Sequence, residues 1–137
     1  MALLGLRPSD PLPEGGQRLT LSVRSGSGTA ASWTGLFGPA LEARYHVVLE
    51  PGSLNLWADA PILWQDPVHI IESTVTGEFC PVILEECAVG VAFRANKATP
   101  TYLEVLSPVH LRTRLNLSDG QPITVRLLPG SFLKAAV

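Results

Sequence analysis

The chain has 137 residues, of which 46% are hydrophobic and 16% are charged, and its formal net charge is −2. This length suits one compact domain with its own core and leaves no room for a second domain. Because the arginines are scattered and the balance is slightly acidic, no basic stripe is present that would follow a nucleic-acid backbone.

Residues 1–16 predict a loosely held N-terminal arm, since they contain three prolines and end in Gly15 and Gly16. Their apolar run is too short for a secretory signal, and no other segment has the uninterrupted apolar length that a bilayer requires. We therefore expect a cytoplasmic protein that makes no membrane contact, with a single folded domain over residues 17–137.

The first predicted strand covers residues 18–24, where Leu19, Leu21 and Val23 alternate with polar residues. Residues 32–37 are interpreted as a second strand, and Pro39 is expected to open a short helix. Further short strands are predicted between turn residues. They cover residues 45–49, 53–58, 68–75, 79–84 and 88–93.

The C-terminal part predicts a short helix and a closing strand. Ser107 is expected to be the N-cap, Pro108 suits the first helical position, and Leu111 and Leu115 would share one face. An Asp-Gly turn then leads to a last strand over residues 123–128. Short strands at this spacing, without long helical periods, indicate an all-β fold and favour a closed barrel over a sandwich.

Cys80 and Cys87 have a spacing that matches no zinc or redox signature. We expect both to be buried and reduced, and the sequence leaves open whether they meet across a hairpin. Glu85 and Glu86 are interpreted as a solvated hairpin tip.

Two short motifs carry candidate chemistry. In the run SGSGTA, residues 25–30, glycines let backbone N–H groups approach phosphate oxygens, although such a run alone is more typical of a flexible turn. In GSLNL, residues 52–56, Ser53 and Asn55 project to the same face of an extended strand, so both oxygens can reach one Mg²⁺. On the residues alone, a turn-closing role for Ser53 and a strand-bonding role for Asn55 are favoured.

Charged side chains near the C-terminus offer further candidates. Glu104 lies within an apolar, alternating segment, so its carboxylate either faces outward or is held by a dedicated partner. The guanidinium fork of Arg112 matches phosphate geometry, and a surface ion pair is an equally favoured role. His110 is compatible with an exposed helix position and is not assigned a catalytic role.

Together with GSLNL, the run over residues 101–127 resembles the archaeal-type CTP-dependent riboflavin kinase family. The resemblance covers the C-terminal third of the chain and the GSLNL motif. It implies a six-stranded cradle-loop barrel with one or two short helices. It also implies Mg²⁺-assisted phosphoryl transfer from CTP to the 5'-hydroxyl of riboflavin, giving FMN and CDP, in a monomer or weak homo-oligomer.

The resemblance also implies roles for individual residues. Phosphate would be cradled by Ser25, Gly26, Ser27, Gly28, Thr29 and Ala30, and the nucleotide further held by Val109, His110, Leu111 and Arg112. Ser53 and Asn55 would hold magnesium. Thr99, within a basic segment that includes Lys97, and Glu104 would orient the flavin, and Glu104 is the candidate to accept the hydroxyl proton.

Three positions depart from the family pattern: Ala30 replaces a third glycine, Ser53 replaces a threonine, and the segment between Thr99 and Glu104 is about two residues shorter than the family's. These departures keep open a barrel that has lost catalysis and binds a flavin, a nucleotide or a partner protein. A DNA-binding relative of the barrel is a third possibility, because the closing L-x-L-x-D-G-x-x-I pattern also occurs in such regulators, but the acidic balance disfavours it.

Overall fold

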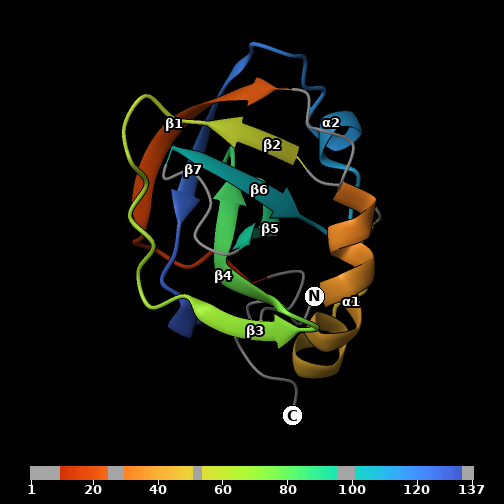
Figure 1. Ribbon diagram of the computed structural model, residues 1–137. Helices are drawn as coiled ribbons and strands as arrows, with labels where there is room; N and C mark the ends of the chain where they lie inside the picture. The colour runs from red at the N-terminus through yellow and green to blue at the C-terminus, as the bar shows by residue number, and fades with distance from the viewer. Residues whose placement is uncertain (1–9, 25–29, 51–53, 96–100, 134–137) are drawn as a thin grey trace.

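The computed structural model describes residues 10–24, 30–50, 54–95 and 101–133, and its dominant feature is a closed antiparallel barrel. Six strands pair in the order β4-β5-β6-β2-β1-β7, and β4 pairs with β7 to close the ring, while β3 adds a seventh strand beside β4. Figure 1 shows this ring with α1 on its outside. The all-β barrel prediction is confirmed.

The bounds of the elements follow the chain order. The strands are β1 (Gln17–Arg24), β2 (Leu54–Trp57), β3 (Val68–Glu72), β4 (Val75–Leu84), β5 (Ala88–Ala95), β6 (Tyr102–Leu106) and β7 (Pro122–Leu127). The helices are α1 (Ala30–Tyr45), α2 (Leu111–Arg114) and the 3-10 helix η1 (Gly130–Phe132). No helix among the described residues has the length and apolar character needed to cross a membrane.

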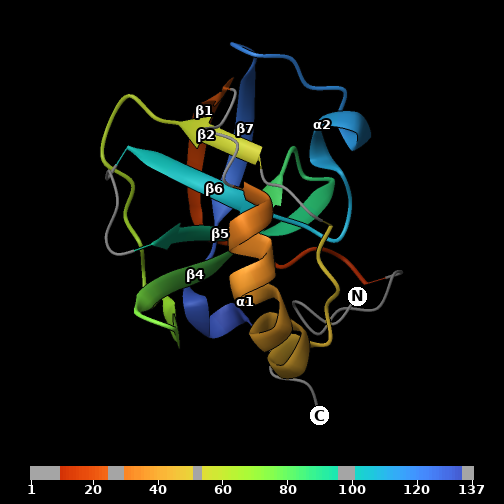
Figure 2. The same ribbon diagram turned by 45° about the vertical axis from the view of Figure 1, so that its right-hand side comes forward.

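The barrel has two separate apolar cores because side chains alternate between the two faces of each strand. The inner core fills the ring and includes Leu21, Val23, Leu56, Leu103 and Val125. The outer core lies between the ring and α1, which crosses β4, β5 and β6 in Figure 2. A residue's position along its strand therefore decides whether its side chain points into the barrel or outward, to the side where α1 packs.

Helix α1 corrects two predictions, because the structure has neither a strand over residues 32–37 nor a helix that starts at Pro39. One helix includes both segments, with Pro39 in its interior. The physical reason is the buried stripe formed by Phe37, Leu41 and Tyr45, spaced four residues apart. The ring of Phe37 lies 5.3 Å from that of Phe79 on β4. Tertiary packing therefore stabilises the helix although it contains two glycines and a proline, which disfavour helices.

Two other predicted strands differ from the observed ones. The prediction for residues 45–49 is wrong: α1 ends at Tyr45, and Val47 and Leu49 are buried in a segment that forms no strand. The predicted strand over residues 68–75 is divided into β3 and β4 by a turn at Ser73, whose φ is 58°. Strand β4 consequently begins four residues earlier than residue 79, where the strand was expected.

The predicted N-cap of the C-terminal helix is also wrong. His110 caps α2, and its ring nitrogen Nδ1 accepts a hydrogen bond from the Thr113 amide. Ser107 lies before the helix, where its hydroxyl donates to the Val89 carbonyl and accepts from the Val109 amide. It therefore links the end of β6 to β5.

The hairpin between β4 and β5 is more than a solvated tip. Glu85 and Glu86 have φ values of 52° and 50°, a left-handed turn that is usually formed by Asn-Gly. The turn is held because the Glu85 carboxylate accepts from the Thr124 amide and the Glu86 carboxylate pairs with the Arg126 guanidinium at 2.6 and 2.9 Å. Both residues are exposed at the hairpin tip, as predicted, and their carboxylates also bond to β7.

The two cysteines lie in different environments, since Cys80 is buried and Cys87 is exposed, and both are free thiols. The prediction that both are buried is therefore wrong for Cys87, which follows the Glu85-Glu86 turn. The Gly15 carbonyl accepts a hydrogen bond from Arg126, so the last part of the predicted arm contacts the barrel.

Candidate functional site

A row of four side chains crosses the outer face of the barrel from β1 to β5. Arg24 is the cross-strand partner of Asn55, Asn55 is the partner of Glu104, and Glu104 is the partner of Phe93. Directly opposed residues point to the same side of a sheet. The register therefore places a cation, an amide, a carboxylate and an aromatic ring side by side, and the row ends where Phe93 packs against Phe37 of α1.

Asn55 and Glu104 are the two predicted site residues that the structure brings together. Both are buried on the outer face, with 6% and 8% of their surface exposed. The prediction assigned them separate tasks, magnesium for Asn55 and flavin for Glu104. Adjacent positions make them parts of one site.

Tyr102 joins these two residues, and the sequence-based reasoning did not identify it. Its hydroxyl is placed to donate a hydrogen bond to Asn55 Oδ1 or to Glu104 Oε1, the latter at 2.6 Å. The signal was present, because a residue two positions before Glu104 shares its face of the strand. The sequence does not show the register of β2 against β6, which places Asn55 beside both Tyr102 and Glu104.

The environment of Tyr102 keeps its hydroxyl protonated. Burial, and then the hydrogen bond to Glu104 and its negative charge, raise the pKa of Tyr102 well above its ordinary value of 10. The Tyr102 ring also lies 4.8 Å from that of Trp57, and the Arg24 guanidinium lies 5.5 Å from the centre of the Trp57 ring. The phenol is therefore a fixed hydrogen-bond donor in a partly aromatic setting.

The glycine-rich run follows Arg24, the first member of this row. Strand β1 ends at Arg24, opposite Asn55, and α1 begins at Ala30. Residues 25–29 lie outside the described residues, as do Ser53, Lys97 and Thr99. Ala30 opens a helix, and the first N–H groups of a helix lack intrahelical partners and favour anions.

The predicted nucleotide contacts around α2 have other partners in the structure. Leu111 belongs to the inner core with 5% of its surface exposed, and His110 caps the helix. Arg112 forms an ion pair with Asp119 at 2.6 Å, and 33% of its side chain is exposed. Val109 is 39% exposed. The structure thus shows Arg112 in the surface ion pair that the sequence offered as its alternative role.

The donor set at Asn55 fits a hard cation. Amide and carboxylate oxygens are the ligands that Mg²⁺ prefers, and the ion commonly keeps several waters and takes phosphate oxygens from its substrate. Within the described ranges, no group of three or more His, Cys, Asp and Glu side chains is placed to hold a metal ion. A cation bound here would therefore rely on nucleotide phosphates and water for most of its coordination.

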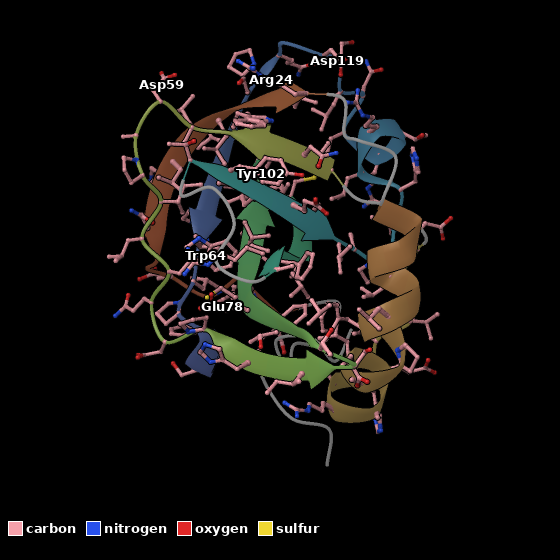
Figure 3. The ribbon with its side chains drawn as sticks, in the orientation of Figure 1. Arg24, Asp59, Trp64, Glu78, Tyr102 and Asp119 are labelled. Carbon is pink, nitrogen blue, oxygen red and sulfur yellow. The ribbon has the colours of Figure 1, made fainter. Side chains whose placement is uncertain are left out.

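A second polar cluster lies on the inner face, near the lower end of the barrel, where Figure 3 labels Glu78 and Trp64. Glu78 is 5% exposed and pairs with Arg94 at 3.0 Å and with His69 at 3.3 Å. The Arg94 guanidinium lies 4.9 Å from the centre of the Trp64 ring. This cluster is separate from the row at Asn55 and closes one end of the inner core.

A polar pocket of about 680 Å³ lies on the outer face near β1 and β7, away from Asn55 and Glu104. Arg126 in its wall already donates to Glu86 and to the Gly15 carbonyl. These contacts join the N-terminal segment and the β4-β5 hairpin to the barrel. The pocket is lined by Leu12, Glu14, Gly15, Arg18, Glu86 and Arg126.

Comparison with protein-family models finds no family that matches this chain, and comparison with curated proteins also finds no match.

Proposed function

We propose that this chain is a CTP-dependent riboflavin kinase that transfers a phosphoryl group to the 5'-hydroxyl of riboflavin with the help of Mg²⁺. The observation that supports the proposal best is the pairing of Asn55 with Glu104 across β2 and β6, beside Arg24, the last residue of β1 before the glycine-rich run. The resemblance of the sequence to that kinase family gives the substrates. A cytoplasmic monomer or weak homo-oligomer belongs to the same proposal.

Each group has a role that its chemistry allows. The amide oxygen of Asn55, with Ser53, would hold the cation, and the backbone amides of residues 25–30 would bind the phosphates. Glu104, with Thr99, would orient riboflavin and accept the proton of its 5'-hydroxyl. The 5'-oxygen then forms a bond to the γ-phosphorus of CTP, the bond from that phosphorus to the bridging oxygen breaks, and CDP leaves.

A strong base is not required for this reaction. Phosphoryl transfer is accelerated mainly by positioning the reactants and by stabilising charge on the phosphate oxygens. The fixed donors and acceptors around Asn55 suit that task.

The test is to incubate the purified protein with riboflavin, CTP and Mg²⁺ and to separate FMN from riboflavin chromatographically. We expect FMN, with far less product when ATP replaces CTP. Asn55→Ala and Glu104→Gln should each lower kcat/KM at least a hundredfold. Glu72→Gln, a matched change on β3, should leave it unaltered, and a folded wild-type protein that makes no FMN would refute the proposal.

A second candidate function is a barrel that binds a flavin or nucleotide without catalysis. The observation that favours it is the contact of Tyr102 with both Asn55 and Glu104, since a purely structural network would satisfy these groups in the same way. Such a protein would quench riboflavin fluorescence, or purify with bound flavin, and form no FMN.

A further inference from the structure

Arg24 is an exposed cation at the β1 end of the row that includes Asn55. Its guanidinium lies 5.5 Å from the centre of the Trp57 ring, and among the described residues it forms no ion pair and donates no hydrogen bond. A cation is attracted electrostatically to an aromatic face and needs no hydrogen-bond acceptor there. The five N–H donors of the guanidinium therefore have no acceptor in the part of the chain that the structure describes.

Trp57 positions this guanidinium on the side of the sheet where Asn55 lies. Trp57 follows Asn55 by two residues, so the two side chains share one face of β2. The Trp57 ring is itself restrained, because the ring of its cross-strand partner Tyr102 lies 4.8 Å away. A side chain that is already restrained loses less conformational entropy when it binds a ligand.

The charges described at this end of the barrel favour an anionic ligand. The Asp119-Gly120 turn meets the end of β1, where the Gly120 amide donates to the Val23 carbonyl at 2.7 Å, and Figure 3 labels Arg24 and Asp119 at the same end. The Asp119 carboxylate accepts a hydrogen bond from Arg112 at 2.6 Å. Two guanidinium groups thus accompany one carboxylate, which leaves an excess of positive charge.

We propose that Arg24 binds the phosphates of the nucleotide and that Trp57 is the residue that positions its guanidinium. This inference rests on the proposed function and deepens it, since Arg24 directly precedes the run to which that function assigns the phosphates. A guanidinium fork matches the geometry of phosphate oxygens. Arg24 thereby supplies the phosphate-binding cation that the sequence suggested at Arg112.

The first test measures binding and does not depend on turnover. Inorganic tripolyphosphate carries the anionic part of CTP without its base or ribose, and calorimetric titration in the presence of Mg²⁺ gives its Kd. Arg24→Ala should raise this Kd about ten- to a hundredfold, which is the typical worth of a hydrogen bond to a charged group. Arg24→Lys keeps the charge without the fork and should recover only part of the affinity.

Arg18→Ala is the matched control for Arg24→Ala. Arg18 is also an exposed arginine of β1 and points to the same face, but it lies about 20 Å from Arg24 along the extended strand. Its replacement should leave the Kd for tripolyphosphate unchanged. Trp57→Leu removes the aromatic face and should raise that Kd about two- to fivefold, with a smaller rise in Trp57→Phe.

The second test uses turnover. In Arg24→Ala the KM for CTP should rise about tenfold, while the KM for riboflavin stays nearly unchanged. Arg24→Gln replaces Arg24→Ala in both tests if circular dichroism shows that the alanine variant does not fold.

The inference is wrong if the wild type binds no tripolyphosphate, if its Kd equals that of Arg24→Ala, or if Arg18→Ala weakens binding as much as Arg24→Ala does. An unchanged KM for CTP in an active Arg24→Ala variant also contradicts it. A wild-type protein that makes no FMN refutes the proposed function instead. In that case, weaker binding of tripolyphosphate by Arg24→Ala alone still identifies Arg24 as a phosphate-binding residue.

Discussion

Cys80 and Cys87 illustrate how strongly a side chain's environment controls its chemistry. Cys80 faces the inner core, and burial, followed by the nearby charge of Glu78, raises the pKa of its thiol to about 12. Since the thiolate is the nucleophile, a thiol with a raised pKa stays protonated and inert at pH 8. Cys87 is exposed after the hairpin turn.

We predict that iodoacetamide at pH 8 modifies one thiol per folded chain, at Cys87, and both thiols in denaturant. The mass of the intact protein, followed by peptide mapping, measures this. Cys87→Ser should leave the folded chain unmodified. Comparable rates at the two thiols of the folded wild type would contradict the burial of Cys80.

At the same scale, the sequence identified single site residues but not the way they combine. Asn55 and Glu104 were recognisable from their motifs, because a polar side chain in an apolar strand is costly to bury unless it has a hydrogen-bonding partner. Their pairing depends on the register of β2 against β6, which is set by contacts far apart in the chain. Tyr102 was missed because only that register gives its hydroxyl two partners.

Helix α1 shows that packing can outweigh local preference. Its sequence includes Gly35, Gly38 and Pro39, which are poor helix formers, and these residues led to the incorrect prediction. The alternative signal was the spacing of Phe37 and Leu41, which burial against β4 and β5 makes decisive. Local preference thus predicted the wrong element where the outer core supplies most of the stability.

Because α1 contains glycines that disfavour a helix, we predict that a substitution can stabilise it. Gly35 is exposed, and a Cβ atom added there would meet nothing within 4 Å. Gly35→Ala should therefore raise the free energy of unfolding by about 0.5–1 kcal/mol, because alanine loses less backbone entropy in a helix. Urea denaturation followed by circular dichroism measures the change.

Gly90 on β5 provides the opposite control. A Cβ atom there would lie 2.6 Å from Val105 Cγ1 and 2.8 Å from the Leu106 carbonyl oxygen. Gly90→Ala should destabilise the protein, since the backbone of β6 would have to move. A Gly35→Ala variant that unfolds more readily than wild type would show that α1 needs a glycine at this position.

At the scale of the whole molecule, the sequence predicts the fold class but not how the ring closes. Many short strands between turn residues are enough to indicate an all-β barrel. Closure depends on β4 pairing with β7, where Ile83 lies opposite Arg126, forty-odd residues along the chain. Pairings at such separations leave no local pattern. The prediction also placed the break between β3 and β4 after residue 75 instead of at the turn around Ser73.

The buried ion pair between β4 and β5, at the end of the barrel where Trp64 lies, offers a further test. Glu78 is 5% exposed and is held by Arg94 through two hydrogen bonds of 3.0 and 3.4 Å, with His69 on its other side. Removing Arg94 alone leaves a buried carboxylate with only a half-exposed histidine beside it. Loss of one partner of a buried pair typically costs about 3–5 kcal/mol.

We therefore predict that Arg94→Met lowers the free energy of unfolding by about 3–5 kcal/mol, whereas the double variant Glu78→Gln, Arg94→Met loses less because no buried charge remains. Urea denaturation measures both. Trp64 fluorescence should report the loosened end in the single variant. If the double variant is at least as unstable as Arg94→Met, an unpaired buried charge is not the cause of the lost stability, and the prediction is wrong.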